Sequence, residues 1–226
     1  MNTCPLSVGS ASLAALGSGA LWWPSESLLA VADLHLGRSE RQARLGAGLL
    51  PPYETEDTLN RLEDVITTSA ARTIVFVGDS FDDLTAAEEL ADTIGERLLR
   101  LASGRRFVWV AGNHDPGPVD LPGSNMSAYR HGGLMFRHIA KPGAEGEVSG
   151  HYHPKARFRL KGQFISRPCF LTDDQRIVLP AFGTYTGGLD IQNPAFDRVF
   201  PDDCQAILTG RRLVKISRAR IGDTAS

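Results

Sequence analysis

Three short, nearly continuous apolar runs mark the first half of the chain, at residues 28–32, 73–77 and 106–111. Runs of this length are typical of strands that are covered on both faces. Between them, apolar residues recur at helical spacing over residues 55–69 and 86–101, and Gly104 is a suitable helix stop. The pattern predicts the order strand, helix, strand, helix, strand, which is typical of an α/β fold.

The pattern changes after Pro116, where few helical segments follow. Residues 143–146 predict a turn, and four further runs predict strands, at residues 158–165, 176–182, 205–208 and 213–216. No internal repeat or low-complexity linker separates the two halves. For a chain of 226 residues, one large domain with two sheets (residues 1–226) is therefore expected, with two small domains as the alternative.

The composition is that of an ordinary globular protein, with 42% hydrophobic and 22% charged residues. It excludes a disordered tail and a collagen-like repeat. No apolar run approaches the ~18 residues of a membrane span, so no membrane partner is expected. The widely spaced Cys4, Cys169 and Cys204 predict neither a disulfide framework nor a zinc–thiolate site. No lysine or arginine precedes Arg38, so a secretory signal is not indicated and a reducing cytoplasm is expected.

The net charge of −2, from 24 basic and 26 acidic residues, provides no overall basic field for a nucleic-acid partner. The basic residues are unevenly divided, since only 4 of the 24 are lysines and the other 20 are arginines. The planar guanidinium suits bidentate contact with phosphate. A genome that favours arginine codons explains the same bias, and composition does not separate the two explanations.

Polar clusters follow the apolar runs, at the strand ends where open α/β sheets place their sites. The motifs, in chain order, are Asp33-Leu34-His35, Gly78-Asp79-Ser80-Phe81-Asp82-Asp83, Gly112-Asn113-His114-Asp115, the single His138, and Gly150-His151-Tyr152-His153. Five of the six histidines fall in these segments, and the sixth is His131. Each motif alone has a structural explanation, such as a turn, a helix cap or a hydrogen-bonded core histidine. Their joint occurrence favours a metal site.

Mixed imidazole, carboxylate and amide ligands suit Mn²⁺, Fe²⁺ or Zn²⁺ better than Ca²⁺ or Mg²⁺, which prefer oxygen ligands. The candidate ligands outnumber what one ion needs. Two ions that share a bridging carboxylate are therefore predicted.

The five motifs, in this order, resemble the signature of the calcineurin-like metallophosphoesterases, and the resemblance spans residues 33–153. It implies a four-layer αββα sandwich, in which two mixed β-sheets pack face to face with helices outside. It also implies a first metal held by Asp33, His35, Asp79 and His153. A second metal would be held by Asp79, Asn113, His138 and His151, with Asp79 bridging.

The resemblance further assigns His114 to the scissile phosphate, where it protonates the leaving oxygen, and Asp82 to the orientation of His114. The neighbouring Asp83 is the alternative for that second role. A pair of ions ~3.5–4 Å apart lowers the pKa of a bridging water, which attacks phosphorus in line. Mn²⁺ is the expected metal, with Fe²⁺, Zn²⁺ and Ni²⁺ as alternatives, and phosphate ester hydrolysis is the predicted reaction.

Two further stretches resemble the bacterial ligase-associated DNA-damage-response endonuclease family: residues 36–39 followed by 49–55 and Leu59, and residues 179–190. With them the likeness covers most of residues 28–208. It implies DNA as the substrate, an endonucleolytic phosphodiesterase as the activity, and a DNA ligase, a helicase and an exonuclease as possible partners of a repair system.

Several basic and aromatic residues are candidate substrate contacts. Lys155, Arg157, Arg159 and Lys161 alternate with apolar residues, so one strand would have a basic face; an edge strand protected by charge is the alternative. Arg38, with Arg41 and Arg44 at helical spacing, would reach phosphate or form a solvated helix face. Residues 183–188 predict a loop beside the site, whose Tyr185 would stack on a base or pack in a turn.

Other functions of the superfamily differ in their sequence signals. Protein phosphatases of this superfamily carry Arg after the second Asp of GDxxD and Glu after GNH, whereas Asp83 and Asp115 stand there in this chain. A phosphodiesterase or phosphatase of small nucleotides is the alternative among enzymes. A non-catalytic metal-binding scaffold for repair partners is the alternative outside enzymes, and the complete ligand set argues against it. The oligomeric state is not predicted.

Overall fold

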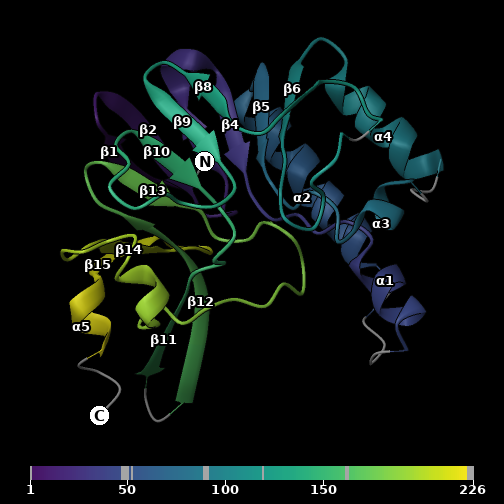
Figure 1. Ribbon diagram of the computed structural model, residues 1–226. Helices are drawn as coiled ribbons and strands as arrows, with labels where there is room; N and C mark the ends of the chain where they lie inside the picture. Colours follow the sequence, from purple (N-terminus) through teal and green to yellow (C-terminus); the bar gives the residue numbers. More distant parts are fainter. Residues whose placement is uncertain are drawn as a thin grey trace.

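The computed structural model describes residues 2–46, 51, 53–88, 92–118, 120–160 and 163–222. Two β-sheets lie at its centre, and helices α1 to α4 gather on one side of the molecule with α5 on the opposite side (Figure 1). Among the described residues, no helix has the length and apolar composition needed to cross a bilayer.

The first sheet is mixed, with its strands in chain order. They are β1 (Thr3–Val8), β2 (Ala11–Leu16), β3 (Leu21–Trp23), β4 (Leu28–Val31), β5 (Thr73–Val77), β6 (Arg106–Val110) and β7 (Ser124–Met126). The pairs from β1 to β4 are antiparallel. The pairs from β4 to β7 are parallel, so β4, β5 and β6 all end at the same edge of the sheet.

Side chains of the central strands alternate between two hydrophobic layers. In β5, Val75 and Val77 face the second sheet, while Ile74 and Phe76 face the helices. The helices on this face are α1 (Arg38–Arg44), α2 (Glu54–Ser69), α3 (Leu84–Glu88) and α4 (Asp92–Ala102). This double coverage explains why the strands are apolar at nearly every position.

The second sheet has the order β15-β14-β12-β13-β10-β9-β8. Its strands are β8 (Tyr129–His131), β9 (Leu134–Arg137), β10 (Glu147–Ser149), β12 (Gln163–Thr172), β13 (Arg176–Val178), β14 (Gln205–Leu208) and β15 (Val214–Ser217). The β9, β10 and β13 strands are parallel, and the other pairs are antiparallel. β11 (Lys155–Leu160) pairs with β12 in a hairpin that projects from the sheet (Figure 1).

The outer face of the second sheet is covered by η2 (Pro194–Phe196), the residues after it, and α5 (Arg218–Gly222). Phe196, Phe200 and Ile221 pack there in a third hydrophobic layer. Helices, sheet, sheet and helices thus form the four-layer sandwich that the sequence predicts. That residues 1–226 form a single domain stays a prediction.

One predicted element is wrong. The run at residues 158–165 predicts one strand, but the structure has two antiparallel strands, β11 and β12, with residues 161 and 162 between them. Periodicity alone did not reveal that the chain reverses direction between them. Lys161 lies outside the described residues, and Lys155, Arg157 and Arg159 share one face of β11.

Smaller differences follow from local packing. Within the predicted helix at 86–101 the structure describes α3 and α4, and residues 89–91 between them lie outside the described residues. The predicted strand at 176–182 is a strand only to Val178, after which the chain crosses to the first sheet, where Ala181 bridges Ala32. Strands β1 to β3 were not predicted, although their buried residues recur at every second position.

Candidate metal centre

The candidate ligands lie where strands of both sheets end. Asp33 and His35 follow β4, Asp79 follows β5, and Asn113 follows β6. Across the sandwich, His138 follows β9, and the pair His151 and His153 follows β10. Parallel pairing of the strands that precede them brings segments more than a hundred residues apart in the chain to one edge.

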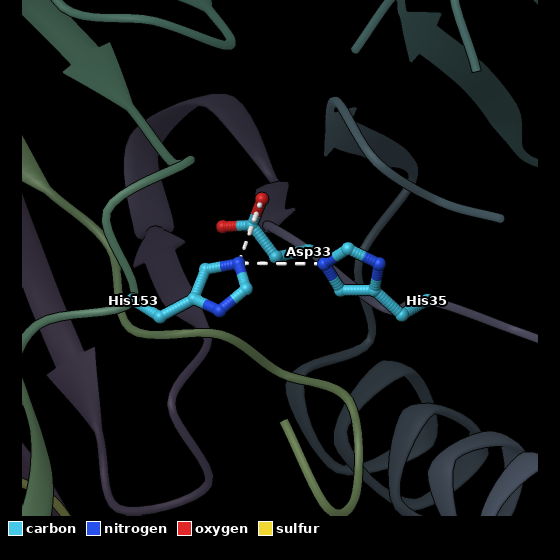
Figure 2. A group of neighbouring side chains, drawn as sticks. All are labelled: Asp33, His35 and His153. Atoms are coloured by element: carbon cyan, nitrogen blue, oxygen red, sulfur yellow. Dashed lines mark hydrogen bonds and ion pairs between the residues drawn. The ribbon is translucent and has the colours of Figure 1, made fainter. Parts of the chain in front are cut away.

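A first group consists of Asp33, His35 and His153, whose ligand atoms all lie within 4.8 Å of one another. Nε2 of His153 is 3.4 Å from Oδ1 of Asp33 and 3.4 Å from Nε2 of His35. Figure 2 shows Asp33 and His35, both from the segment after β4, and His153, from the segment after β10, pointing toward one another. A carboxylate and two imidazoles at these distances are a suitable ligand set for a divalent cation such as Mn²⁺, Fe²⁺ or Zn²⁺.

A second group consists of Asp79, His138 and His151, again within 4.8 Å. Nε2 of His138 lies 3.3 Å from Oδ2 of Asp79, 3.2 Å from Nδ1 of His151 and 2.9 Å from Oδ1 of Asn113. The other ring nitrogen of His138 lies 3.3 Å from the Val77 carbonyl oxygen, which fixes the ring as metal-binding histidines usually are.

Asp79, a member of the second group, also faces the first. Its Oδ2 is 3.3 Å from Nε2 of His138 and 4.0 Å from Nε2 of His35. Its Oδ1 accepts a hydrogen bond of 2.9 Å from the backbone N–H of His114, so the carboxylate is held in place. This is the position that a bridging ligand requires.

The two groups influence each other's protonation. Burial favours the neutral form of Asp79, but the hydrogen bond and charge of His138, with further polar contacts, outweigh burial and lower the pKa of Asp79 to about 2. Burial likewise opposes the charge on His138, but Asp79 and Asp33 outweigh it and raise the pKa of His138. The carboxylate of Asp79 is therefore kept in its charged form at the centre of the site.

Five of the candidate ligands have a left-handed backbone, with φ of 54° at Asp33, 48° at His35, 46° at Asp79, 72° at His151 and 46° at His153. Such conformations are costly for residues other than glycine and occur where surrounding contacts enforce them, often at functional sites. Here the Asp33 carboxylate accepts the backbone N–H of His151 at 2.9 Å, and His35 N–H donates to the Asp79 carbonyl at 3.0 Å.

Two motif glycines permit the close approach of these loops. A Cβ at Gly78 would overlap the His138 ring, and one at Gly112 would overlap the Asp79 carboxylate and backbone. Because glycine lacks a Cβ, the strand ends come near enough for the ligands to meet.

Asp115 has a role that the sequence analysis did not assign. Its buried carboxylate accepts four backbone N–H groups, from Asp79, Gly112, Ser80 and Phe81, at 2.7–3.2 Å. Burial and the nearby Asp79 raise the pKa of Asp115, although the N–H groups oppose this shift. The carboxylate joins the loop after β5 to the loop after β6. Its position at the end of the GNHD motif was the only signal in the sequence.

Asp82 forms a third group with His35 and His114, whose ligand atoms also lie within 4.8 Å of one another. Within it the short contact of the Asp82 carboxylate is with His35, where Oδ1 is 2.9 Å from Nδ1. The His114 ring instead meets the backbone carbonyl of Asp82, with Nδ1 at 2.8 Å. Asp82 is buried, and although burial alone would raise its pKa, the contacts with His35, Arg41 and Arg38 lower it. A histidine bound on one nitrogen by a carboxylate, with the other facing the site, is the usual arrangement for a metal ligand.

The arginines of α1 contact carboxylates. Arg38 and Arg41 lie 3.3 and 3.1 Å from the Asp82 carboxylate, and Arg44 lies 2.9 Å from Asp83. A solvated helix face therefore does not describe them, because they attach α1 to the loop after β5.

The other candidate substrate contacts lie along β11 and the loop at 183–188. Lys155 donates to the Thr186 carbonyl at 2.8 Å, and burial lowers the pKa of Lys155. Arg157 is 56% exposed and lies 3.7 Å from Asp190. Tyr185 is 48% exposed, and a hydrogen bond with Tyr53 raises the pKa of Tyr185. The Gly183 N–H donates to the Asp33 carbonyl at 3.1 Å, so the loop lies beside the site as predicted.

The family model of the calcineurin-like phosphoesterases matches residues 27–183 of this chain, and the chain belongs to that family. The match contains every motif residue described above. The chain is a metal-dependent phosphoesterase whose aspartate and histidine groups are able to hold divalent cations.

The chain also matches solved structures. The nuclease MPE of Pseudomonas putida is 27% identical, with a TM-score of 0.73, over 95% of this chain and 100% of the other. The phosphoesterase YfcE of E. coli is 15% identical, with a TM-score of 0.43, over 84% of this chain and 97% of the other. No match was found among curated proteins.

Proposed function

We propose that this chain hydrolyses phosphodiester bonds in DNA with a pair of divalent cations. The observation that carries the proposal is the place of Asp79, whose one carboxylate oxygen faces an imidazole of each ligand group, 4.0 Å from His35 and 3.3 Å from His138. Two cation sites that share a carboxylate suit the in-line displacement of a phosphate ester.

In this proposal, Asp33, His35, Asp79 and His153 hold the first cation, and Asp79, Asn113, His138 and His151 hold the second. The donor set of carboxylate, imidazole and amide favours Mn²⁺, with Fe²⁺, Zn²⁺ and Ni²⁺ as alternatives. When bound, the cations neutralise the phosphate oxygens and supply a nucleophile at neutral pH.

His114 is proposed to supply the proton for the leaving oxygen. A carbonyl oxygen only accepts hydrogen bonds, so the 2.8 Å contact between Asp82 O and Nδ1 of His114 places a proton on Nδ1. The nitrogen that exchanges protons is therefore Nε2. The His114 ring lies 5.1 Å from the His35 ring, centroid to centroid, so His114 stands beside the first ligand group without joining it through Nδ1.

DNA as the substrate is supported by two observations. The similar structure from Pseudomonas putida is a nuclease. In addition, Lys155, Arg157 and Arg159 share one face of β11, which begins two residues after His153, and Tyr185 is exposed on the adjacent loop. Arg38 could contact phosphate by exchanging its bond to Asp82. The expected ligase, helicase and exonuclease partners and the cytoplasmic location stay predictions from the sequence.

The test compares metal-free and Mn²⁺-loaded protein on bis-p-nitrophenyl phosphate, the monoester p-nitrophenyl phosphate, and single- and double-stranded DNA. We expect diester turnover and DNA cleavage only with metal, and loss of both in Asp79→Ala with a lower metal content. Asp174→Ala, which changes an exposed aspartate, is the control and keeps both.

Each alternative gives a distinct result. A preference for the monoester, or for mononucleotides over DNA, identifies a small-nucleotide enzyme instead. A protein that binds two metal ions and hydrolyses none of the four substrates is a scaffold, and the proposal is then wrong.

A further inference from the structure

A cavity of about 380 Å³ adjoins the second ligand group. Asn113 and His138 form part of its wall, together with Ser127, Arg137, Ile139 and Lys141. Its volume falls within the roughly 300–1,000 Å³ of small-molecule sites. Substrate bound at the cations would therefore meet this cavity directly.

The wall presents one apolar and one cationic side chain to solvent. Ile139 is 45% exposed, although large aliphatic residues are usually buried, and Lys141 is exposed. Arg137 is bound by the buried Glu147, with Nε 2.9 Å from Oε2, and Glu147 also accepts the Lys141 backbone N–H at 3.1 Å. Arg137 and Glu147 neutralise each other, so the charge offered to a ligand comes from Lys141.

A second cavity lies beside this one. It has a volume of about 250 Å³, shares Ala111 and Ser127 with the first, and is also lined by Pro116 and Met126. A mononucleotide would fill only the cavity next to the ligands, whereas a chain of nucleotides would be long enough to extend toward the second.

We infer that this cavity receives the nucleoside attached to the scissile phosphate, with Ile139 against its sugar and base and Lys141 on the next phosphate of the strand. The inference rests on the proposed function and deepens it, because it makes the substrate an oligonucleotide. Ile139 provides contact area without base selectivity, and Lys141 provides a salt-sensitive phosphate contact.

The test uses three diesters that differ only in what the cavity would hold. Bis-p-nitrophenyl phosphate has no nucleoside, thymidine 5′-(p-nitrophenyl phosphate) has a nucleoside and no second phosphate, and an oligo-dT strand has both. We expect Ile139→Ala to lower kcat/KM about tenfold for both nucleoside substrates, relative to bis-p-nitrophenyl phosphate, because the burial of three carbon atoms is lost. We expect Lys141→Ala to lower it for oligo-dT relative to the thymidine ester.

A binding measurement gives a readout that does not depend on turnover. Fluorescein-labelled oligo-dT is titrated with metal-free protein at several salt concentrations, and Lys141→Ala is expected to reduce the salt slope by about 0.7, the value of one lost phosphate contact on a single strand. Matched controls are Lys215→Ala, an exposed lysine on β15 at the far edge of the sheet, and Leu99→Ala, an exposed leucine on α4. Neither is expected to change a rate ratio or the slope.

The outcomes separate the inference from the proposed function. If wild-type protein hydrolyses bis-p-nitrophenyl phosphate and oligo-dT, but neither variant changes the ratios or the slope, only the inference is wrong. If wild-type protein hydrolyses no diester, the proposed function itself fails.

Discussion

Two regions of the molecule differ in how firmly their side chains are fixed: the strand ends that carry the candidate metal ligands, called the edge below, and the β11–β12 hairpin, which begins two residues after His153. Asp33 and Asp79 at the edge are 0% and 2% exposed, and each carboxylate accepts a backbone N–H from a distant loop. On the hairpin, Arg157 is 56% exposed and has one carboxylate partner at 3.7 Å.

The difference agrees with the two proposed roles, cation binding at the edge and substrate binding on the hairpin. Cation binding requires ligands that are in place before the ion arrives, and the loops are fixed by buried hydrogen bonds and strained backbone for that purpose. Substrate binding along a strand requires surface charge that tolerates variation. We therefore expect single changes at the edge to have large effects and single changes on the hairpin to have small ones.

The largest of these effects is expected for His114→Ala. Loss of the proposed proton donor should lower kcat by about 10²- to 10⁴-fold, most for substrates with poor leaving groups, while the content of bound metal stays that of the wild type. Rates on aryl and alkyl diesters, together with metal analysis, test this. His131→Ala is the control, since His131 bonds Glu26 on another face. Loss of metal in His114→Ala would make His114 a ligand and contradict the assignment.

Asp115→Asn should strongly lower the stability of the edge. The amide NH₂ would face two of the four N–H groups that the carboxylate now accepts, and each buried donor left unpaired costs about 1–3 kcal/mol. We expect the free energy of unfolding to fall by about 2–4 kcal/mol, measured by urea denaturation of metal-free protein. The exposed Asp174→Asn is the control. Unchanged stability would show that Asp115 does not brace the two loops.

Asp82→Ala tests the contact with His35. Removing a carboxylate that orients a metal-bound histidine usually weakens metal affinity by about 10- to 100-fold. Asp82→Asn keeps an oxygen that can accept from His35 Nδ1, so a smaller loss is expected. Mn²⁺ titration followed by calorimetry measures both. Asp83→Ala is the control, because that carboxylate pairs with Arg44 and caps α3 at Ala86 N–H. Equal losses in Asp82→Ala and Asp83→Ala would refute a specific role for Asp82.

The sequence predicted features that depend on local order and missed contacts between segments that are distant along the chain. The ligand motifs were identified from their joint occurrence, because five polar motifs in a fixed order, each after an apolar run, resemble the signature of the family, although each motif alone has a structural explanation. The partners of Asp82 and Asp115 were not, since their contacts join segments that only the sheet topology brings together. Arg38 and Arg41 show the same limit: their helical spacing was visible, but the carboxylate of Asp82, some forty residues away along the chain, was not.

Arg157→Ala should have the smallest effect. A solvated arginine with a distant partner contributes little to stability, so unfolding should be unchanged within about 0.5 kcal/mol. Its loss should lower DNA affinity less than about threefold near 0.15 M salt and reduce the salt slope by about 1 if it contacts one phosphate. Anisotropy with labelled DNA measures both, with the exposed Arg100→Ala on α4 as the control. An unchanged slope would indicate that the charges on β11 only protect an edge strand and do not bind DNA. A loss of DNA affinity of about 10- to 100-fold, as large as the loss of Mn²⁺ affinity expected for Asp82→Ala, would remove the distinction between the two regions.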